Sequence, residues 1–147
     1  MKLVDTEETV VLVTGSGIAQ EEKDRPLAYW LKERIDARGE GLPYRRAVVV
    51  SDLWYLEHRL FHLNPTIAIG GPGVNGVSRA FGDELPTVLT EDDRWLVQAD
   101  FDGDLKRACL WGLDAASTAT AVEAFVERGL LAELLGRIWR FRTGTYV

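Results

Sequence analysis

TVVLVTG, residues 9–15, is an unbroken run of β-branched and other apolar residues that ends in a glycine. Such a run is typical of a strand buried on both faces, because neither face carries regularly spaced polar side chains. Two similar runs follow it, RRAVVVSD at 45–52 and TIAIGG at 66–71. We predict that residues 10–14, 47–51 and 66–70 form adjacent central strands of one parallel sheet.

The segments between these runs have helical spacing. In the first segment Asp24 and Pro26 are typical of a helix start, and they precede an apolar stripe of Leu27, Leu31 and Ile35. In the second segment Asp52 can cap a helix before Asn64-Pro65 closes it. Its apolar stripe is formed by Leu53, Leu56, Leu60 and Leu63. NGVSRAFGDEL (75–85) predicts a short third helix, and this alternation of strands and helices indicates right-handed crossovers.

The pattern changes after residue 90. RWLVQADF (94–101) and LKRACLW (105–111) flank Asp-Gly, which is a hairpin signal. Helical stretches then run from about 117 to 128 and from about 130 to 142. We expect one α/β domain over residues 1–147, a Rossmann-like three-layer sandwich. Its mostly parallel sheet would have about five strands, with one antiparallel hairpin at an edge.

Composition restricts the class of partner. The 147 residues carry a formal net charge of −6, which argues against nucleic acid because phosphate contacts need clustered Lys and Arg. Cys109 is the one cysteine, so an intrachain disulfide and a thiolate metal cluster are excluded. The first residues lack the long apolar run of a secretory signal, and no segment has the roughly 18 apolar residues of a membrane span. We expect a cytoplasmic protein.

Small and polar residues end every predicted parallel strand, and ligands of open α/β sheets bind at that edge. The candidate ligand-binding residues of this crevice are Gly15, Ser16, Gly17, Ser51, Asp52, Gly70, Gly71, Gly73, Asn75 and Asp114. Helix N-termini at this edge would offer free N–H groups to a small anionic or polar metabolite. Turn and cap chemistry explains the same residues without a ligand, with Gly70 and Gly71 leaving the strand and Asn75 capping the next helix.

Known site motifs are incomplete in this chain. GSGIAQ (15–20) lacks the third glycine of a dinucleotide loop, and GGPGVNG (70–76) lacks the Lys-Ser/Thr of a phosphate-binding loop. His58 and His62 are spaced to share a helix face, but a third zinc ligand is not apparent. DFDGD (100–104) does not match a calcium loop, and G-x-S-x-G is absent. We expect no metal and no cofactor, and no catalytic residue can be assigned.

Two stretches, IAIGGPGVN (67–75) and WGLDAASTATAVEAF (111–125), resemble strand-end patterns of α/β modules in prokaryotic S-layer and cell-wall-binding surface proteins. The matching positions are Gly70, Gly71, Pro72, Asn75, Gly112, Asp114, Thr118 and Ala121. The resemblance implies an α/β module with a structural or binding role rather than a catalytic one.

The leading interpretation is a non-catalytic small-ligand-binding or regulatory domain that uses the strand-end crevice. Two alternatives stay open: a hydrolase or transferase with Asp52 or Asp114 as acid–base group, and an assembly subunit without a ligand. We also expect a homo-oligomer formed through the C-terminal segment. LLAELLGRIWRF (130–141) is apolar over more than one stripe, and Arg140 and Arg142 would contact acids of a second subunit.

Overall fold

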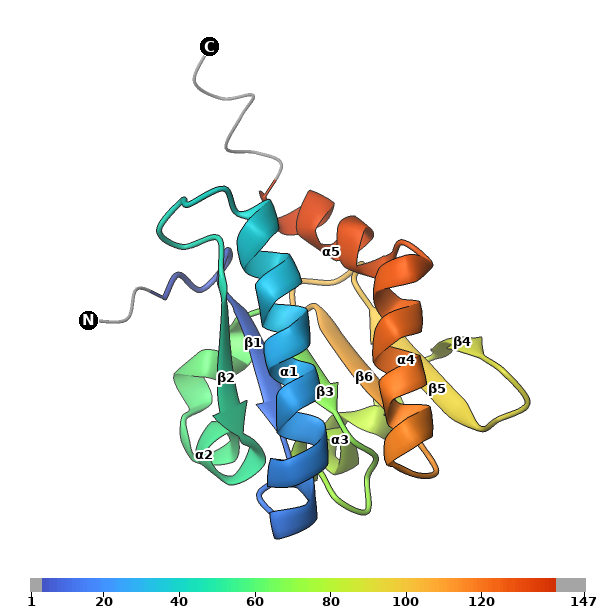
Figure 1. The fold of residues 1–147 in the computed structure, drawn as a ribbon. Coiled ribbons are helices and arrows are strands. Elements are labelled where there is room, and N and C mark those ends of the chain that lie inside the picture. Colours follow the sequence, from blue (N-terminus) through green and yellow to red (C-terminus); the bar gives the residue numbers. More distant parts are fainter. Residues whose placement is uncertain (1–3, 140–147) are drawn as a thin grey trace.

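A six-stranded sheet with strand order β2-β1-β3-β6-β5-β4 is the middle of three layers (Figure 1). The structure is a computed structural model that describes residues 4–139. The strands are β1 (Val10–Thr14), β2 (Ala47–Ser51), β3 (Thr66–Ile69), β4 (Thr87–Thr90), β5 (Trp95–Asp100) and β6 (Arg107–Gly112). The strands β2, β1, β3 and β6 run parallel, whereas β5 and β4 are each antiparallel to their neighbours. The predicted three-layer α/β sandwich is therefore confirmed.

The sheet has six strands, in line with the predicted number of about five, and the short and largely exposed β4 continues it beyond β5. Strands β5 and β6 form the predicted antiparallel hairpin. Two details of the prediction are wrong. The hairpin strand β6 lies inside the sheet next to β3, so only β4 and β5 extend to that edge. The run at 47–51 forms β2 at the opposite edge rather than a central strand. Its apolar residues are still covered, because helical segments flank the sheet on both faces.

One face of the sheet carries the long helices, as Figure 1 shows. They are α1 (Ile18–Arg38), α4 (Ala115–Glu127) and α5 (Leu130–Trp139). The other face carries shorter segments: α2 (Asp52–Glu57), the 3₁₀ turn η1 (Arg59–Leu63), α3 (Gly76–Phe81) and the 3₁₀ turn η2 (Gly82–Glu84). Alternation along β1 divides the core, since Val10 and Leu12 pack on the α1 side and Val11 and Val13 on the α3 side.

The free edge of β2 is partly closed by α1. The Ala47 amide donates a hydrogen bond to Asp36 Oδ1 at 2.8 Å, and its carbonyl accepts one from Lys32 Nζ at 2.7 Å. Lys32 also pairs with Asp36 at 2.6 Å. Charged side chains that satisfy outward-facing backbone groups are a known means of blocking an edge strand.

Both predicted features of the first helix start are wrong. The helix α1 begins at Ile18 after Gly17, which supplies no side-chain cap. Asp24 and Pro26 therefore lie inside the helix, and Asp24 is buried. The side chain of Pro26 is on the exposed surface. Gly17 at the true start has no side chain to act as a cap, so the usual helix-start signal indicated a position about two turns too late.

The predicted leucine stripe of the second helix does not face the core. The helix α2 ends at Glu57, and a 3₁₀ turn continues the chain to Leu63. Leu53, Leu56, Leu60 and Leu63 are 62%, 37%, 81% and 56% exposed. Tyr55 fills the core instead, and its hydroxyl lies 2.8 Å from Thr66 Oγ1. Ser51 rather than Asp52 is the N-cap, because its hydroxyl oxygen accepts from the Trp54 amide.

The C-terminal helix is covered by its own chain. Leu131, Leu134, Leu135 and Trp139 are buried, and Leu130 and Ile138 pack partly buried against the same core. The Trp139 ring donates a hydrogen bond to the Glu8 carbonyl at 2.8 Å. The apolar surface that was expected to need a second subunit is thus accounted for within one chain. Arg140 and Arg142 lie outside the described residues.

We predict that Leu60→Gln changes the free energy of unfolding by no more than about 0.5 kcal/mol, because an exposed leucine makes few contacts. The matched change Leu31→Ala in α1 is expected to cost about 2–5 kcal/mol, because Leu31 is fully buried. Urea denaturation of both variants measures the two values. A large loss for Leu60→Gln would contradict the exposed position of the leucine stripe.

Candidate functional site

The carboxyl ends of the parallel strands meet at one edge, as the sequence predicted. Thr14 of β1 lies opposite Ser51 of β2 and Ile69 of β3 in the sheet register. The loops that follow these residues therefore start at the same level. Hydrogen bonds at this edge join Ser16 to Asp52, Asp52 to Gly76, and Asn75 to the ends of β1 and β3. The same loops carry the other candidates Gly15, Gly17, Ser51, Gly70, Gly71 and Gly73.

Asn75 is completely buried at this edge and uses its whole side-chain amide in hydrogen bonds. Its Nδ2 group donates to the carbonyls of Val13 at 3.1 Å and Ile69 at 2.9 Å. Its Oδ1 atom accepts from the amides of Val77 at 2.9 Å and Ser78 at 3.4 Å. Asn75 thus joins the ends of β1 and β3 and caps α3, which leaves it no group for a ligand.

Asp52 is also committed to the protein. Its Oδ2 accepts from the Gly76 amide at 2.7 Å, and its Oδ1 accepts from the Leu53 amide at 2.8 Å. The Ser16 hydroxyl donates to the same Oδ1. These hydrogen bonds connect the loops after β1, β2 and β3, so the role of Asp52 is to hold these loops together.

The glycines of this edge permit close contacts. Gly70 has φ of +112°, a left-handed conformation that favours glycine, and a Cβ there would lie 3.1 Å from Asp24 Oδ2. A Cβ on Gly71 would lie 2.8 Å from the Trp111 ring. Gly73 faces open space. Packing against α1 and β6 therefore determines the conformation of the loop 70–75, and only its tip at Gly73 has no neighbouring atoms that a side chain would meet.

Asp114 is separate from the other candidates. It caps α4, where its Oδ1 accepts from the Ser117 amide at 2.8 Å and from the Ser117 hydroxyl at 2.5 Å. The hydrogen bond from the Ser117 hydroxyl, with that from its amide, lowers the pKa of the Asp114 carboxyl. A different cavity of about 510 Å³ lies beside it, next to Glu91 and Arg94. Asp114 is therefore a helix cap that stays ionised near neutral pH.

Asp24 is the residue that sequence reasoning missed. It lies on the buried face of α1 with Ala28, Leu31 and Ile35, and only 5% of it is exposed. Within residues 4–139 no group hydrogen-bonds to its carboxylate and no Lys or Arg pairs with it. Burial raises the pKa of Asp24 to about 6 from an ordinary 3.8. Reading the apolar stripe of α1 back by one turn would have placed Asp24 on the core face.

Thr14 is a second polar group without a described partner. It is fully buried, and its Oγ1 accepts or donates no hydrogen bond in the described part of the chain. Its side chain has the same orientation as Val10 and Leu12, which face α1. Asp24 and Thr14 therefore lie on the same side of the sheet, at the ends of the central strands.

The two histidines do not form a shared site. The His58 ring stacks on Trp54 at 3.9 Å, and its Nδ1 lies 2.7 Å from the Trp54 carbonyl. The His62 ring stacks on Tyr55 at 4.3 Å, and its Nε2 lies 2.7 Å from the Tyr55 carbonyl. Cys109 is buried in β6, and burial raises the pKa of its thiol to about 11, which leaves it protonated.

Comparison with known proteins adds no family to this geometry, since neither a protein-family model nor a curated protein matches the chain. Over residues 4–139, His, Cys, Asp and Glu do not gather into groups of three or more that could hold a metal ion. In the same range, no helix combines the length and apolar character needed to cross a membrane. Asp24 and Thr14 therefore remain the groups at this edge whose role the fold does not explain.

We predict that Asp24→Asn raises the stability of the protein at pH 7.5. The carboxylate has a folded pKa of about 6. Below about pH 4 the Asp24 carboxyl is protonated in the folded protein and burying it carries no charge penalty, whereas the penalty for burying the ionised form develops as the pH rises through about 6. Since one pKa unit corresponds to about 1.4 kcal/mol, the gain for the neutral amide is at most about 3 kcal/mol.

Urea denaturation at pH 4 and pH 7.5 measures this difference, which should vanish at the lower pH. Asp52→Asn is the matched control and should lose stability, because Asp52 accepts hydrogen bonds from Gly76 and Leu53. An Asp24→Asn variant that is destabilised more at pH 7.5 than at pH 4 would show that the ionised carboxylate has a partner in the folded protein, and one destabilised equally at both pH values would show that its pKa is not raised.

Proposed function

We propose that this protein is a non-catalytic binding domain that takes a small polar ligand at the carboxyl ends of β1 and β3, with Asp24 as the anchor. The observation that carries the proposal is the buried carboxylate of Asp24, which has no described partner. A desolvated and unpaired carboxylate costs stability. Ionisable groups with strongly shifted pKa values cluster at functional sites, which makes Asp24 a candidate.

The chemistry of Asp24 favours a ligand that donates hydrogen bonds. An ionised carboxylate only accepts them, so an ammonium or hydroxyl group would supply the missing donor. A phosphate or carboxylate ligand would bring a second negative charge next to the first. The anionic metabolite expected from the helix N-termini is therefore less favoured than an amine or a polyol. Thr14 offers a hydroxyl that can donate to or accept from the same ligand.

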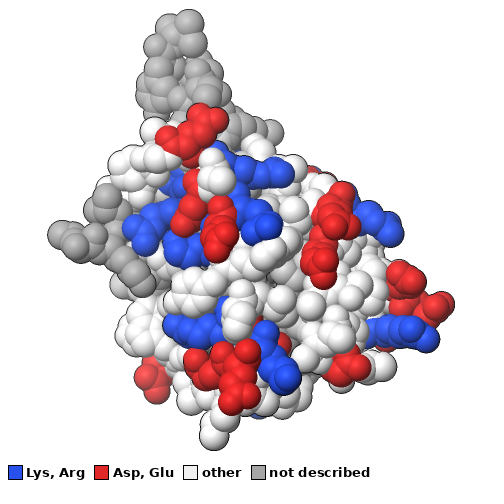
Figure 2. All heavy atoms as spheres, in the orientation of Figure 1, with Lys and Arg blue, Asp and Glu red and all other residues white. Residues whose placement is uncertain are grey.

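The surface around the long helices adds no broad attraction for anions. On the face shown in Figure 2, acidic and basic side chains lie next to each other and do not separate into large patches of one sign. Ion pairs on α1 follow this pattern, with Arg25 and Glu21 at 3.8 Å and Lys32 and Asp36 at 2.6 Å. Specificity would then come from the buried carboxylate itself.

An enzyme is the second candidate, and the pKa of Asp24 favours it. A carboxyl group that titrates near pH 6 can give or take a proton at near-neutral pH. No hydroxyl or imidazole of the described residues hydrogen-bonds to Asp24, since the Ser16 hydroxyl donates to Asp52 and both histidines contact backbone carbonyls of the α2 segment. Binding without catalysis therefore agrees better with the geometry.

The proposal is tested by a thermal-shift screen of amines and neutral polyols against their phosphorylated or carboxylated counterparts, such as glucosamine and glucose against glucose 6-phosphate. We expect the melting temperature to rise with members of the first group, because they bind only the folded state. Asp24→Asn should abolish these shifts. Glu33→Gln, a change at an exposed position of the same helix, should keep them.

An amine that binds should do so more tightly as the pH rises from 5 to 7, because Asp24 then becomes ionised. Isothermal titration of the best compound at both pH values measures this change. Shifts produced by the anionic counterparts alone, or shifts that survive Asp24→Asn, would overturn the proposal.

A further inference from the structure

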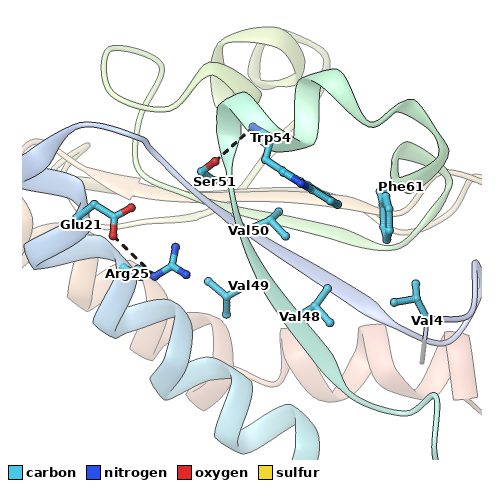
Figure 3. A pocket seen from close by; sticks show the side chains of 9 residues that line it. All are labelled: Val4, Glu21, Arg25, Val48, Val49, Val50, Ser51, Trp54 and Phe61. Carbon is cyan, nitrogen blue, oxygen red and sulfur yellow. Dashed lines mark hydrogen bonds and ion pairs between the residues drawn. The ribbon is translucent and has the colours of Figure 1, made fainter. Parts of the chain in front are cut away.

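A groove of about 800 Å³ runs along the free edge of β2, between α1 and the α2–η1 segment (Figure 3). It exists because β2 pairs with β1 on one side only, so that the flanking helices overhang the open edge. Its volume lies within the range of small-molecule sites in proteins. The groove is distinct from the Asp24 site, since Asp24 faces the interior of the sheet and does not line it.

One end of the groove is apolar. Val48 and Val50 point toward the α2 side, where they meet Trp54, Phe61 and Val4 (Figure 3). The Trp54 and Phe61 rings lie 5.0 Å apart at an angle of 57° and form a continuous aromatic wall. Trp54 remains 36% exposed although it is the largest side chain of this wall. An aliphatic or aromatic body of a ligand would bury this surface.

The other end of the groove offers hydrogen-bond donors. Ser51 Oγ accepts from the Trp54 amide at 3.3 Å, which leaves its own hydrogen available to donate. The Arg25 guanidinium contacts the Tyr29 hydroxyl at 3.3 Å and Glu21 at 3.8 Å, both at the surface. These contacts leave N–H groups of Arg25 free for a further acceptor. Figure 3 shows Ser51, Arg25 and Glu21 gathered at this end.

Donors at one end and apolar side chains at the other select an amphipathic ligand whose head is an acceptor. A carboxylate is a suitable head group, because its two oxygens can accept hydrogen bonds from both Arg25 and Ser51, and bonds of this charge-assisted kind are short and strong. A β-strand of another protein fits less well. The Ala47 amide and carbonyl are already bonded to Asp36 and Lys32, which interrupts the edge that an added strand would need.

We propose that the groove along β2 binds a monocarboxylate with an apolar body, of the class of medium-chain fatty acids or aryl acids. The body lies on Val48, Val50, Trp54 and Phe61. The carboxylate pairs with Arg25 and accepts from Ser51. Glu21, at the same end, makes a second acidic group on the ligand unfavourable, so that monocarboxylates are preferred over dicarboxylates.

Isothermal titration with octanoate, 1-octanol and octylamine tests this inference, because the three probes share one alkyl chain and differ in the head. Octanoate is expected to bind at least tenfold more tightly than the other two. Arg25→Gln should weaken octanoate at least tenfold and remove its advantage over 1-octanol. The matched control is Arg34→Gln on the same helix, which stacks on Trp30 outside the groove and should leave the affinity unchanged.

Indole N–H signals in NMR spectra locate the bound probe, and Trp54→Phe identifies the Trp54 signal while keeping an aromatic wall. Octanoate should shift that signal in the unchanged protein. Asp24→Asn should bind octanoate normally, which separates this inference from the proposed function. Equal affinity for octanoate and 1-octanol, an Arg25→Gln variant that binds as tightly as the parent, or an unshifted Trp54 signal would each overturn it.

Discussion

Asn75 holds the carboxyl ends of the two central strands together, and the rest of the strand-end edge depends on it. Its side-chain amide donates to carbonyls at the ends of β1 and β3 and accepts from the Val77 and Ser78 amides in the first turn of α3. Among the side-chain hydrogen bonds of residues 4–139, no other side chain joins both of these strands to the helix that follows. Because it is completely buried, an unpaired amide there would be costly, so the loop 70–75 must take the conformation that satisfies it.

The strand-end edge shows how a parallel sheet uses the same residue types that ligand sites use. Asp52 and Ser16 connect three loops, Ser51 caps α2, and Asp114 caps α4. Each of these groups was a reasonable candidate for a ligand, because hydroxyls and carboxylates at strand ends serve both purposes. Asp24 and Thr14 differ from them in one respect that matters: within residues 4–139 no protein group hydrogen-bonds to Asp24 Oδ or Thr14 Oγ1.

The parallel core could be predicted because the sequence patterns that indicate it lie within short segments of the chain. Three apolar runs and the helical spacing between them are sufficient to indicate β1, β2 and β3 with their crossovers, and Asn75 could be identified as a cap. The order of the strands could not, since no local signal places β6 beside β3 or leaves β2 at an edge. The spacing of apolar residues also does not show which face of a helix is buried. Four leucines near α2 are regularly spaced and exposed, whereas Tyr55 fills the core. Asp24 was missed for a related reason, because an acid near a proline is typical of a helix start.

The strand order also determines the route by which the chain can fold. The turn between β5 and β6 joins Asp100 to Arg107, so the antiparallel unit can assemble from contacts that are close in the chain. Val11 must instead meet Thr66, and Thr66 must meet Arg107, and each of these pairings closes a long loop at an entropic cost. Because β3 lies between β1 and β6, its docking joins the two halves of the sheet. The nascent chain therefore cannot complete its sheet until β6 has been synthesised, and β1, β2 and β3 must wait with an open edge until then.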